Sequence, residues 1–223
     1  MKVPASPVPS STPLPSSTPL PSSSPLPSST PLPSSSPLPS SFYERPAPKL
    51  AIALLGCSLI RRIGDSWVGG IITETEAYTE DDEASHSFRG QTLRNAAMFQ
   101  KPGTLYVYRI YGIHFCLNIS SGAEGLGEAV LIRSIEPLWG VDVMRELRKW
   151  PEPKPLRGLC NGPGKLAQAM AINLSLNGIY PDESAELQLG PAVQRVTKVQ
   201  KGPRVGITKN VDRPWRFQYS PHL

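Results

Sequence analysis

The sequence lacks the features that mark several common protein classes. It has no run of about 18 apolar residues, so we expect no membrane-spanning helix. Its only three cysteines, Cys57, Cys116 and Cys160, lie far apart and predict no disulfide framework. The N-terminal segment has neither the apolar core of a secretory signal nor the arginines of a transit peptide, so neither is expected.

Catalytic and metal-binding motifs are scarce as well. The three histidines have no CxxC or HxxxH neighbours, so we expect no metal site. There is no G-x-S-x-G motif and no base close to a cysteine in sequence, so hydrolysis through a nucleophilic side chain has little support. The segment Asn161-Gly-Pro-Gly-Lys165 resembles a phosphate-binding loop, but Leu166 stands where such a loop needs Ser or Thr. We interpret it as the start of a helix.

The first 41 residues have almost no charge and no aromatic residue. Lys2 is their one charged residue, and they hold 13 of the 26 prolines of the chain. From Ser10 to Pro39 the unit S-S-(S/T)-P-L-P occurs five times. Such a segment cannot bury enough apolar surface to offset the entropy of ordering. We therefore predict a disordered tail over residues 1–41 and one domain over residues 42–223; a proline-rich ligand for a partner is the alternative role of the repeat.

Residues 42–223 predict a mixed α/β fold. Helices are expected over residues 46–55, 141–149 and 163–171, and prolines suit the first turn of two of them. Strands are expected over residues 67–78 and 129–135, and over 105–120 with a hairpin bend near Ile110–Gly112. A helical turn is expected near residues 94–99, and the alternation of polar and apolar residues after 193 predicts further strands.

Two glutamates fall on one face of the strand expected over residues 67–78. The period of two places Glu74, Glu76 and Tyr78 on the same side. On a buried face these carboxylates must be paired, hydrogen-bonded or functional, whereas a solvent-exposed face would carry them without any function. The residues alone leave both interpretations open.

Aromatic residues gather in the expected hairpin over residues 105–120. Tyr106, Tyr108 and Tyr111 are followed there by His114 and Asn118. They indicate either a sheet core with tyrosines at its edges or an aromatic pocket for flat heterocycles. The net charge of +5 suits a polyanionic partner but is too small to identify one.

Short motifs run in a fixed order through nearly all of residues 42–223. The two most specific are Ile72-Thr-Glu-Thr-Glu-Ala-Tyr78 and Tyr106-Val-Tyr-Arg-Ile-Tyr-Gly112. Others are Asp82-Glu-Ala-Ser-His86, Thr92-Leu-Arg-Asn95, Leu131-Ile-Arg133 and Cys160-Asn-Gly-Pro163. Together they resemble the alkyladenine-type 3-methyladenine DNA glycosylase (DNA-3-methylpurine glycosylase) family. The resemblance does not reach residues 1–41.

The resemblance implies a fold and an activity. The fold would be a single compact domain around a curved antiparallel β-sheet. The chain would be a monofunctional glycosylase of base excision repair that hydrolyses the N-glycosidic bond of alkylated or deaminated purines, such as 3-methyladenine and hypoxanthine, after they flip out of duplex DNA. It would need no cofactor and no metal, and it would act as a monomer on chromosomal DNA inside the cell.

The resemblance also assigns roles to residues. Glu76 would be the general base that activates water, and Arg133 would help to orient that water. Tyr111 would insert into the gap that the flipped base leaves in the duplex. The base pocket would be lined by Tyr78, His86, Tyr108 and Asn118, with Asn118 crowding the guanine amino group.

The sequence departs from the family pattern at a few positions. Gly164 replaces a usual serine, His114 lies where an aromatic residue is usual, and Thr79 to Glu83 is more acidic and one residue shorter. The competing hypothesis is a non-catalytic nucleic-acid-binding module of the same fold.

Overall fold

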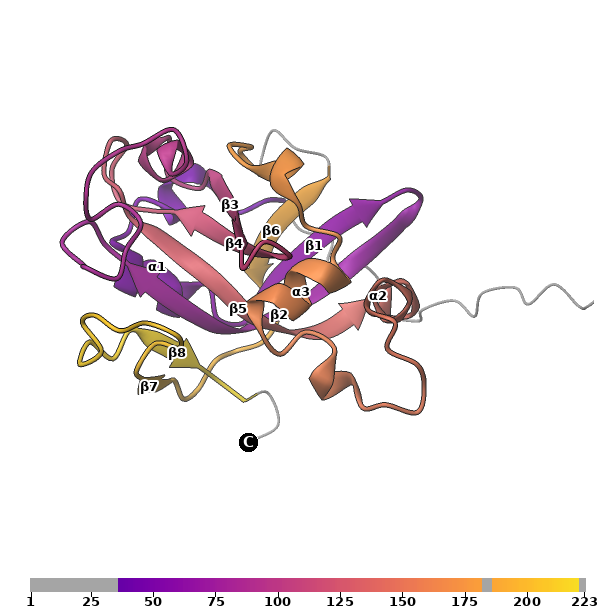
Figure 1. Ribbon diagram of the computed structural model, residues 1–223. Helices are drawn as coiled ribbons and strands as arrows, with labels where there is room; N and C mark the ends of the chain where they lie inside the picture. The colour runs from indigo at the N-terminus through magenta and orange to yellow at the C-terminus, as the bar shows by residue number, and fades with distance from the viewer. Residues whose placement is uncertain (1–35, 182–185, 221–223) are drawn as a thin grey trace, which may run out of the picture.

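The computed structural model describes residues 36–181 and 186–220, which form one eight-stranded antiparallel sheet and three helices (Figure 1). The strands are β1 (Cys57–Ile63), β2 (Ser66–Tyr78), β3 (Leu105–Ile110), β4 (His114–Ser120), β5 (Ala129–Trp139), β6 (Leu187–Ala192), β7 (Gln200–Gly202) and β8 (Arg216–Gln218). The helices are α1 (Ala47–Ala53), α2 (Val141–Arg148) and α3 (Pro163–Ala169). Single 3₁₀ turns are η1 (Ser40–Phe42), η2 (Ala96–Phe99), η3 (Leu156–Gly158) and η4 (Leu174–Leu176). The predicted mixed α/β domain around an antiparallel sheet is confirmed.

The sheet is ordered β3-β4-β5-β2-β1-β6, with β8 paired to β2 and β7 paired to β8. Strand β2 is its longest member and pairs with β1, β5 and β8. A Cβ atom at Gly70 would lie 1.9 Å from the carbonyl oxygen of Glu136, so only glycine lets β5 approach β2 at this point. The register between β2 and β5 shifts at Gly69/Gly70 and on either side of Glu74. Such irregularities bend and twist a strand, and here they lie just before Glu76.

Helices cover both faces of β2. The hydroxyl of Thr75 donates to the carbonyl of Ala51 in α1 at 2.8 Å, so Thr75 points to the face that α1 covers. Its neighbour Glu76 points to the other face because side chains alternate along a strand. On that side α3 begins at Pro163, which lines a cavity together with Glu76; α3 packs against β4 and β5, and α2 packs against α3.

The predicted hairpin between β3 and β4 is present, and its bend lies at Tyr111 and Gly112. The φ angles of these residues are 51° and 73°, and the N–H of Ile113 donates to the carbonyl of Ile110 at 3.3 Å. Two central residues with positive φ are typical of a type I′ turn, whose twist matches that of the flanking strands. The turn leaves the Tyr111 side chain 83% exposed at the tip of the hairpin.

Some elements differ from the sequence-based expectation. Strands β1 and β6 were not predicted, and β5 continues to Trp139, beyond the expected end at residue 135. The buried Leu38 donates its N–H to the carbonyl of Leu189 at 2.8 Å, so the chain joins the domain before residue 42. Residues 1–35, which contain most of the predicted tail, lie outside the described residues. Among the described residues, none of the helices has the length and apolar character needed to cross a membrane.

Candidate active site

A cavity of about 340 Å³ opens on the face of the sheet that Glu76 points to. All seven residues that the family resemblance assigned to the site line this cavity: Glu76, Tyr78, His86, Tyr108, Tyr111, Asn118 and Arg133. They come from β2, the loop after it, the β3–β4 hairpin and β5. The structure therefore brings together residues that are up to 57 positions apart in sequence, from 76 to 133. His114 does not line the cavity; it packs against Gly164, where a Cβ atom would lie 3.2 Å from the His114 Cβ.

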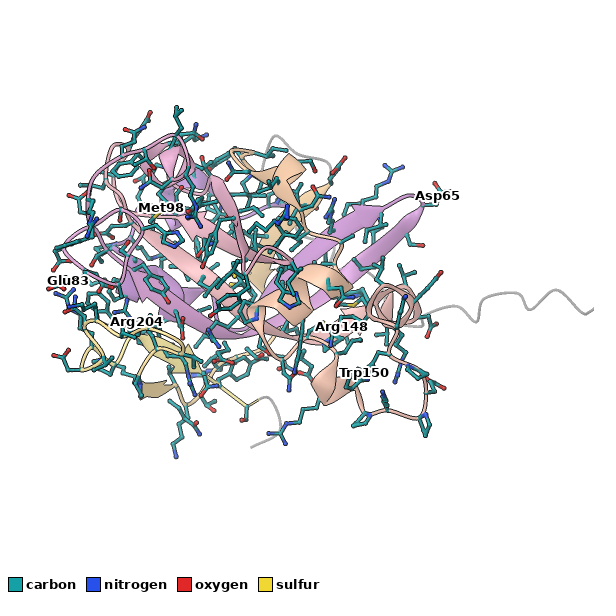
Figure 2. The ribbon with its side chains drawn as sticks, viewed as in Figure 1. Asp65, Glu83, Met98, Arg148, Trp150 and Arg204 are labelled. Atoms are coloured by element: carbon teal, nitrogen blue, oxygen red, sulfur yellow. The ribbon has the colours of Figure 1, made fainter. Side chains whose placement is uncertain are left out.

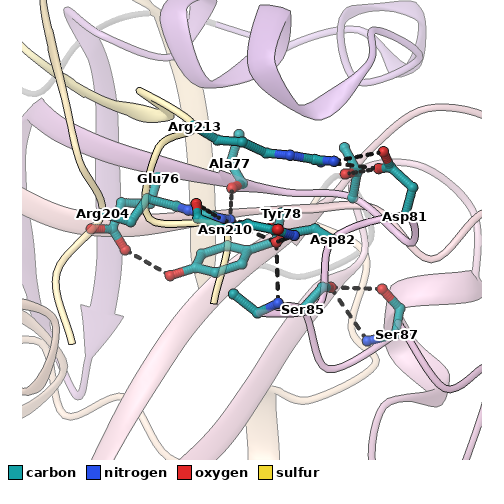
Figure 3. Close-up of polar contacts among 12 residues, drawn as sticks. Glu76, Ala77, Tyr78, Asp81, Asp82, Ser85, Ser87, Arg204, Asn210 and Arg213 are labelled. Carbon is teal, nitrogen blue, oxygen red and sulfur yellow. Dashed lines mark hydrogen bonds and ion pairs between the residues drawn. The ribbon is translucent and has the colours of Figure 1, made fainter. Parts of the chain in front are cut away.

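Glu76 is a fully buried carboxylate with a partner on each oxygen. Its Oε2 accepts a hydrogen bond from the Tyr78 hydroxyl at 2.8 Å, as Figure 3 shows. Its Oε1 accepts one from the backbone N–H of Val205 at 2.8 Å and lies 3.3 Å from Nη1 of Arg133. A buried carboxylate needs such partners, so the alternative of a solvent-exposed strand face is wrong for Glu76.

Arg133 lies between two carboxylates. Its Nε donates to Oε1 of Glu74 at 2.9 Å, and its Nη1 faces Glu76. Burial alone would lower the pKa of Arg133, but Glu76 and Glu74 outweigh burial and raise it. The guanidinium therefore stays charged beside Glu76. Burial and Glu76 both raise the pKa of the Tyr78 hydroxyl, which stays a hydrogen-bond donor.

Three aromatic rings form one wall of the cavity. The His86 ring lies 4.6 Å from the Tyr108 ring between centroids at an interplanar angle of 70°, and the Tyr106 ring lies 5.4 Å from that of Tyr108. Nδ1 of His86 shares a 2.8 Å hydrogen bond with the Tyr106 hydroxyl. Burial and the nearby Arg94 lower the pKa of His86, and burial raises that of Tyr106 to about 12. This wall is therefore uncharged at neutral pH.

Two asparagines fix the shape of the cavity. Asn118 is buried and donates through Nδ2 to the carbonyl of Tyr106 at 3.0 Å, which holds its side chain at the strand that carries the rings. Asn95 donates to the carbonyls of His86 at 2.8 Å and Gly90 at 3.1 Å, and so closes the loop that carries His86. Asn95 lies in one of the quoted motifs, so the sequence marked it without showing its role.

The sequence did not indicate a second group of residues at the site. Val205, Gly206 and Ile207 line the cavity from the segment between β7 and β8. Beside them the buried Arg204 pairs with Asp82, and its guanidinium carbon lies 4.7 Å from the centroid of the Tyr78 ring. No local pattern in Pro203–Ile207 indicates a position beside a strand more than 120 residues earlier.

The arrangement fits a specific chemistry. A carboxylate beside a cavity can accept a proton from a water molecule, and uncharged rings can stack on a flat heterocycle. Within residues 36–181 and 186–220, no three His, Cys, Asp or Glu side chains are grouped so that they could hold a metal ion.

Comparison with known proteins points to one family. Residues 41–222 match the family model described as methylpurine-DNA glycosylase. A protein of Agrobacterium fabrum is 49% identical over 181 residues, covering 79% of this chain and 86% of its own. Proteins of Rhodopseudomonas palustris and Methanoculleus marisnigri are each 45% identical, covering 79% of this chain and 83% and 92% of their own lengths. All three are named as candidate 3-methyladenine DNA glycosylases.

Proposed function

The chain belongs to the methylpurine-DNA glycosylase family, and we propose that it is a monofunctional glycosylase that releases alkylated or deaminated purines from duplex DNA. Enzymes of this family are hydrolases that act on N-glycosyl bonds, and 3-methyladenine and hypoxanthine are the bases we expect this chain to release. One observation carries the proposal: the buried carboxylate of Glu76 lies at the wall of a cavity lined by uncharged rings.

The first step is extrusion of the damaged nucleotide. A base inside the duplex cannot be reached at its glycosidic bond, so the enzyme must flip it out at a cost of a few kcal/mol. Stacking on aromatic side chains returns about 1–3 kcal/mol per base. The wall formed by His86 and Tyr108 offers such a surface, and Tyr78 borders the same cavity.

The second step is hydrolysis. A water molecule next to Glu76 attacks C1′ of the sugar while the bond from C1′ to the base nitrogen breaks; the bond electrons leave with the base, and the water proton passes to Glu76. Before it accepts that proton, the carboxylate also faces the positive charge that develops on the sugar. Arg133, 3.3 Å from Oε1, orients the carboxylate and the water.

Selection of the base follows from the same cavity. N-alkylation makes a purine cationic, so it is a better leaving group than a normal purine, and the uncharged wall accepts it. We infer that Asn118, held by its hydrogen bond to Tyr106, crowds the amino group of guanine and disfavours that base.

The tip of the β3–β4 hairpin supplies the residue that we expect to enter the duplex. We infer that Tyr111 fills the gap left by the flipped nucleotide, because its exposed ring projects from a tight two-residue turn. Replacing Tyr111 with serine is expected to weaken binding to duplex containing a damaged base by roughly tenfold or more, since the stacking of one ring is lost. Binding to undamaged duplex should change much less, because phosphate contacts remain.

The control for this substitution is Tyr111→Phe, which retains the ring. Fluorescence anisotropy with labelled duplexes measures both variants. Equal affinity of wild type and Tyr111→Ser for damaged duplex would contradict the wedge role.

The decisive experiment is a base-release assay with the full chain. Duplexes containing 3-methyladenine or hypoxanthine are incubated with the protein, and the free base is quantified by chromatography. Release above a no-enzyme control supports the proposal. Folded protein that binds DNA and releases neither base would favour the non-catalytic binding module.

We also propose that the protein acts as a monomer on chromosomal DNA inside the cell and that residues 42–223 carry the catalytic activity. Because Leu38 packs on the domain, the deletion that tests this removes residues 1–35 only. The shortened chain is expected to release bases at the wild-type rate. A large loss of activity would instead assign an essential role to the proline repeat.

A further inference from the structure

The amide that bonds Glu76 comes from a segment without regular structure. Residues 203–215, between β7 and β8, contain no helix or strand. The Val205 side chain is 49% exposed, so its own burial does not fix the segment. Its N–H nevertheless lies 2.8 Å from Oε1 of Glu76. A neighbouring residue must therefore hold the amide in place.

That neighbour is Arg204, whose side chain is fully buried. Its Nη1 donates to the carbonyl of Ala77 in β2 at 2.9 Å. Both of its terminal nitrogens bond the carboxylate of Asp82, with Nη2 3.1 Å from Oδ1 (Figure 3). Nη2 also donates to the carbonyl of Asn210 at 3.4 Å. One guanidinium thus joins β2, the loop after β2 and the segment 203–215.

The same guanidinium contacts the ring that supplies the other hydrogen bond to Glu76. Its central carbon lies 4.7 Å from the centroid of the Tyr78 ring and 5.4 Å from that of Trp215. The Tyr78 hydroxyl bonds Oε2 of Glu76. Arg204 therefore contacts the Tyr78 ring, whose hydroxyl bonds Oε2 of Glu76, and also holds the segment whose Val205 amide bonds Oε1.

The partner of Arg204 is fixed from several sides. Asp82 also accepts hydrogen bonds from Nδ2 of Asn210 at 2.8 Å and from the N–H of Ala84 at 3.1 Å. The neighbouring pair of Arg213 and Asp81 has the same residue types, but its side chains are 28% and 69% exposed. Arg213 also lies over the Trp215 ring, 4.6 Å from its centroid. The chain therefore provides a matched pair that does not contact Glu76.

We propose that Arg204 is a positioning residue for Glu76. Its ion pair with Asp82 keeps the amide of Val205 on Oε1 of the catalytic carboxylate. Its contact with the Tyr78 ring keeps the hydroxyl of Tyr78 on Oε2. The proposal rests on the proposed role of Glu76. Lysine cannot replace Arg204 in this role, because an ammonium group lacks the planar set of N–H donors with which a guanidinium bonds a carboxylate and a carbonyl at the same time.

The first test is Arg204→Lys in the full chain, with Arg213→Lys as the matched control. For release of 3-methyladenine, kcat is expected to fall by on the order of 10- to 100-fold, because displacement of a catalytic group by about 1 Å has this effect. KM and the affinity for an abasic-site duplex should stay near wild type. Arg213→Lys should leave all three unchanged. A folded Arg204→Lys protein with wild-type kcat would overturn the proposal.

The second test does not need base release. Hydrogen exchange of the Val205 amide, followed by NMR, is expected to be at least roughly tenfold faster in Arg204→Lys than in wild type, because the bond to Glu76 opens more often. Unchanged exchange in a folded variant would overturn the proposal. If wild type itself releases no base, the proposed function fails, and the exchange measurement still decides whether Arg204 positions the amide.

Asp82→Asn provides a second variant should Arg204→Lys fail to fold. It retains the shape of the side chain but removes its charge, and we expect the same lower kcat and faster Val205 exchange. If its activity falls only in proportion to the folded fraction, and kcat per folded molecule is unchanged, Arg204 and Asp82 stabilise the fold without positioning Glu76.

Discussion

Replacing Glu76 with glutamine is expected to reduce base release by about a hundredfold to ten-thousandfold, the range typical of a lost general base. Glutamine keeps the size of the side chain, and its carbonyl oxygen can still accept one of the hydrogen bonds from Val205 and Tyr78. The amide, however, cannot accept a proton from water, nor can it offer negative charge to the sugar. Single-turnover release of 3-methyladenine from a labelled duplex measures the effect.

A binding measurement distinguishes the loss of the general base in Glu76→Gln from damage to the shape of the cavity. Affinity for a duplex with an abasic-site analogue should stay near wild type in Glu76→Gln, because the rings and the hairpin are intact. Asp65→Asn is the control, since Asp65 lies in the exposed turn between β1 and β2, at the far end of the molecule from Arg204 (Figure 2). Appreciable release by Glu76→Gln would show that another group activates the water.

Replacing Asp82 with alanine is expected to lower the free energy of unfolding by about 3–5 kcal/mol, because the substitution leaves the charge of Arg204 buried without its carboxylate partner. Replacing Asp81, which is 69% exposed and pairs with Arg213, with alanine should lower the free energy of unfolding by only about 0–1 kcal/mol. Urea unfolding at neutral pH measures both. Adding Arg204→Met to Asp82→Ala should restore part of the stability, since no unpaired charge then remains buried. Equal stability of the two alanine variants would contradict the structural role of this pair.

The same pair makes stability depend on acidity. Burial alone would raise the pKa of the Asp82 carboxyl, but hydrogen bonds from Arg204 and Asn210 outweigh burial and hold it below its ordinary value. A carboxyl with a lowered folded pKa stabilises the fold fully above its unfolded pKa of about 3.9, and the stabilisation disappears as the pH falls through the folded value. Wild type should therefore lose more stability than Asp82→Asn on acidification below about pH 4. The melting temperatures of wild type and Asp82→Asn are measured across this pH range. An equal fall in both proteins would argue against the ion pair.

Local patterns were sufficient to predict much of the fold. The alternation along β2 placed Glu74, Glu76 and Tyr78 on one face, and the glycine after Tyr111 located the hairpin bend. Helix α3 begins at Pro163, where the sequence placed its first turn. These signals work because the conformational preferences of proline, glycine and β-branched residues act within a few residues.

The elements that the sequence did not predict depend on contacts between residues far apart in the chain. Strand β1 carries Arg61 and Arg62 in its second half, which weakens the apolar pattern, and β6 has Gly190 and Pro191 within its six residues. Each forms a strand because a neighbouring strand offers a paired edge. The amide of Val205 could not be assigned for the same reason, since it is burial of Arg204 that brings it to Glu76.

The contact between Val205 and Glu76 also has a consequence for the order in which the protein is made. A ribosome produces Glu76 and all the other motif residues before it reaches residue 205. A nascent chain that has only advanced to α3 therefore contains the carboxylate, but one of its oxygens still lacks the amide that bonds it in the finished protein. We expect polypeptides interrupted before residue 205 to be poor catalysts even where strands β1 to β6 have folded, because Oε1 of Glu76 then lacks the amide of Val205.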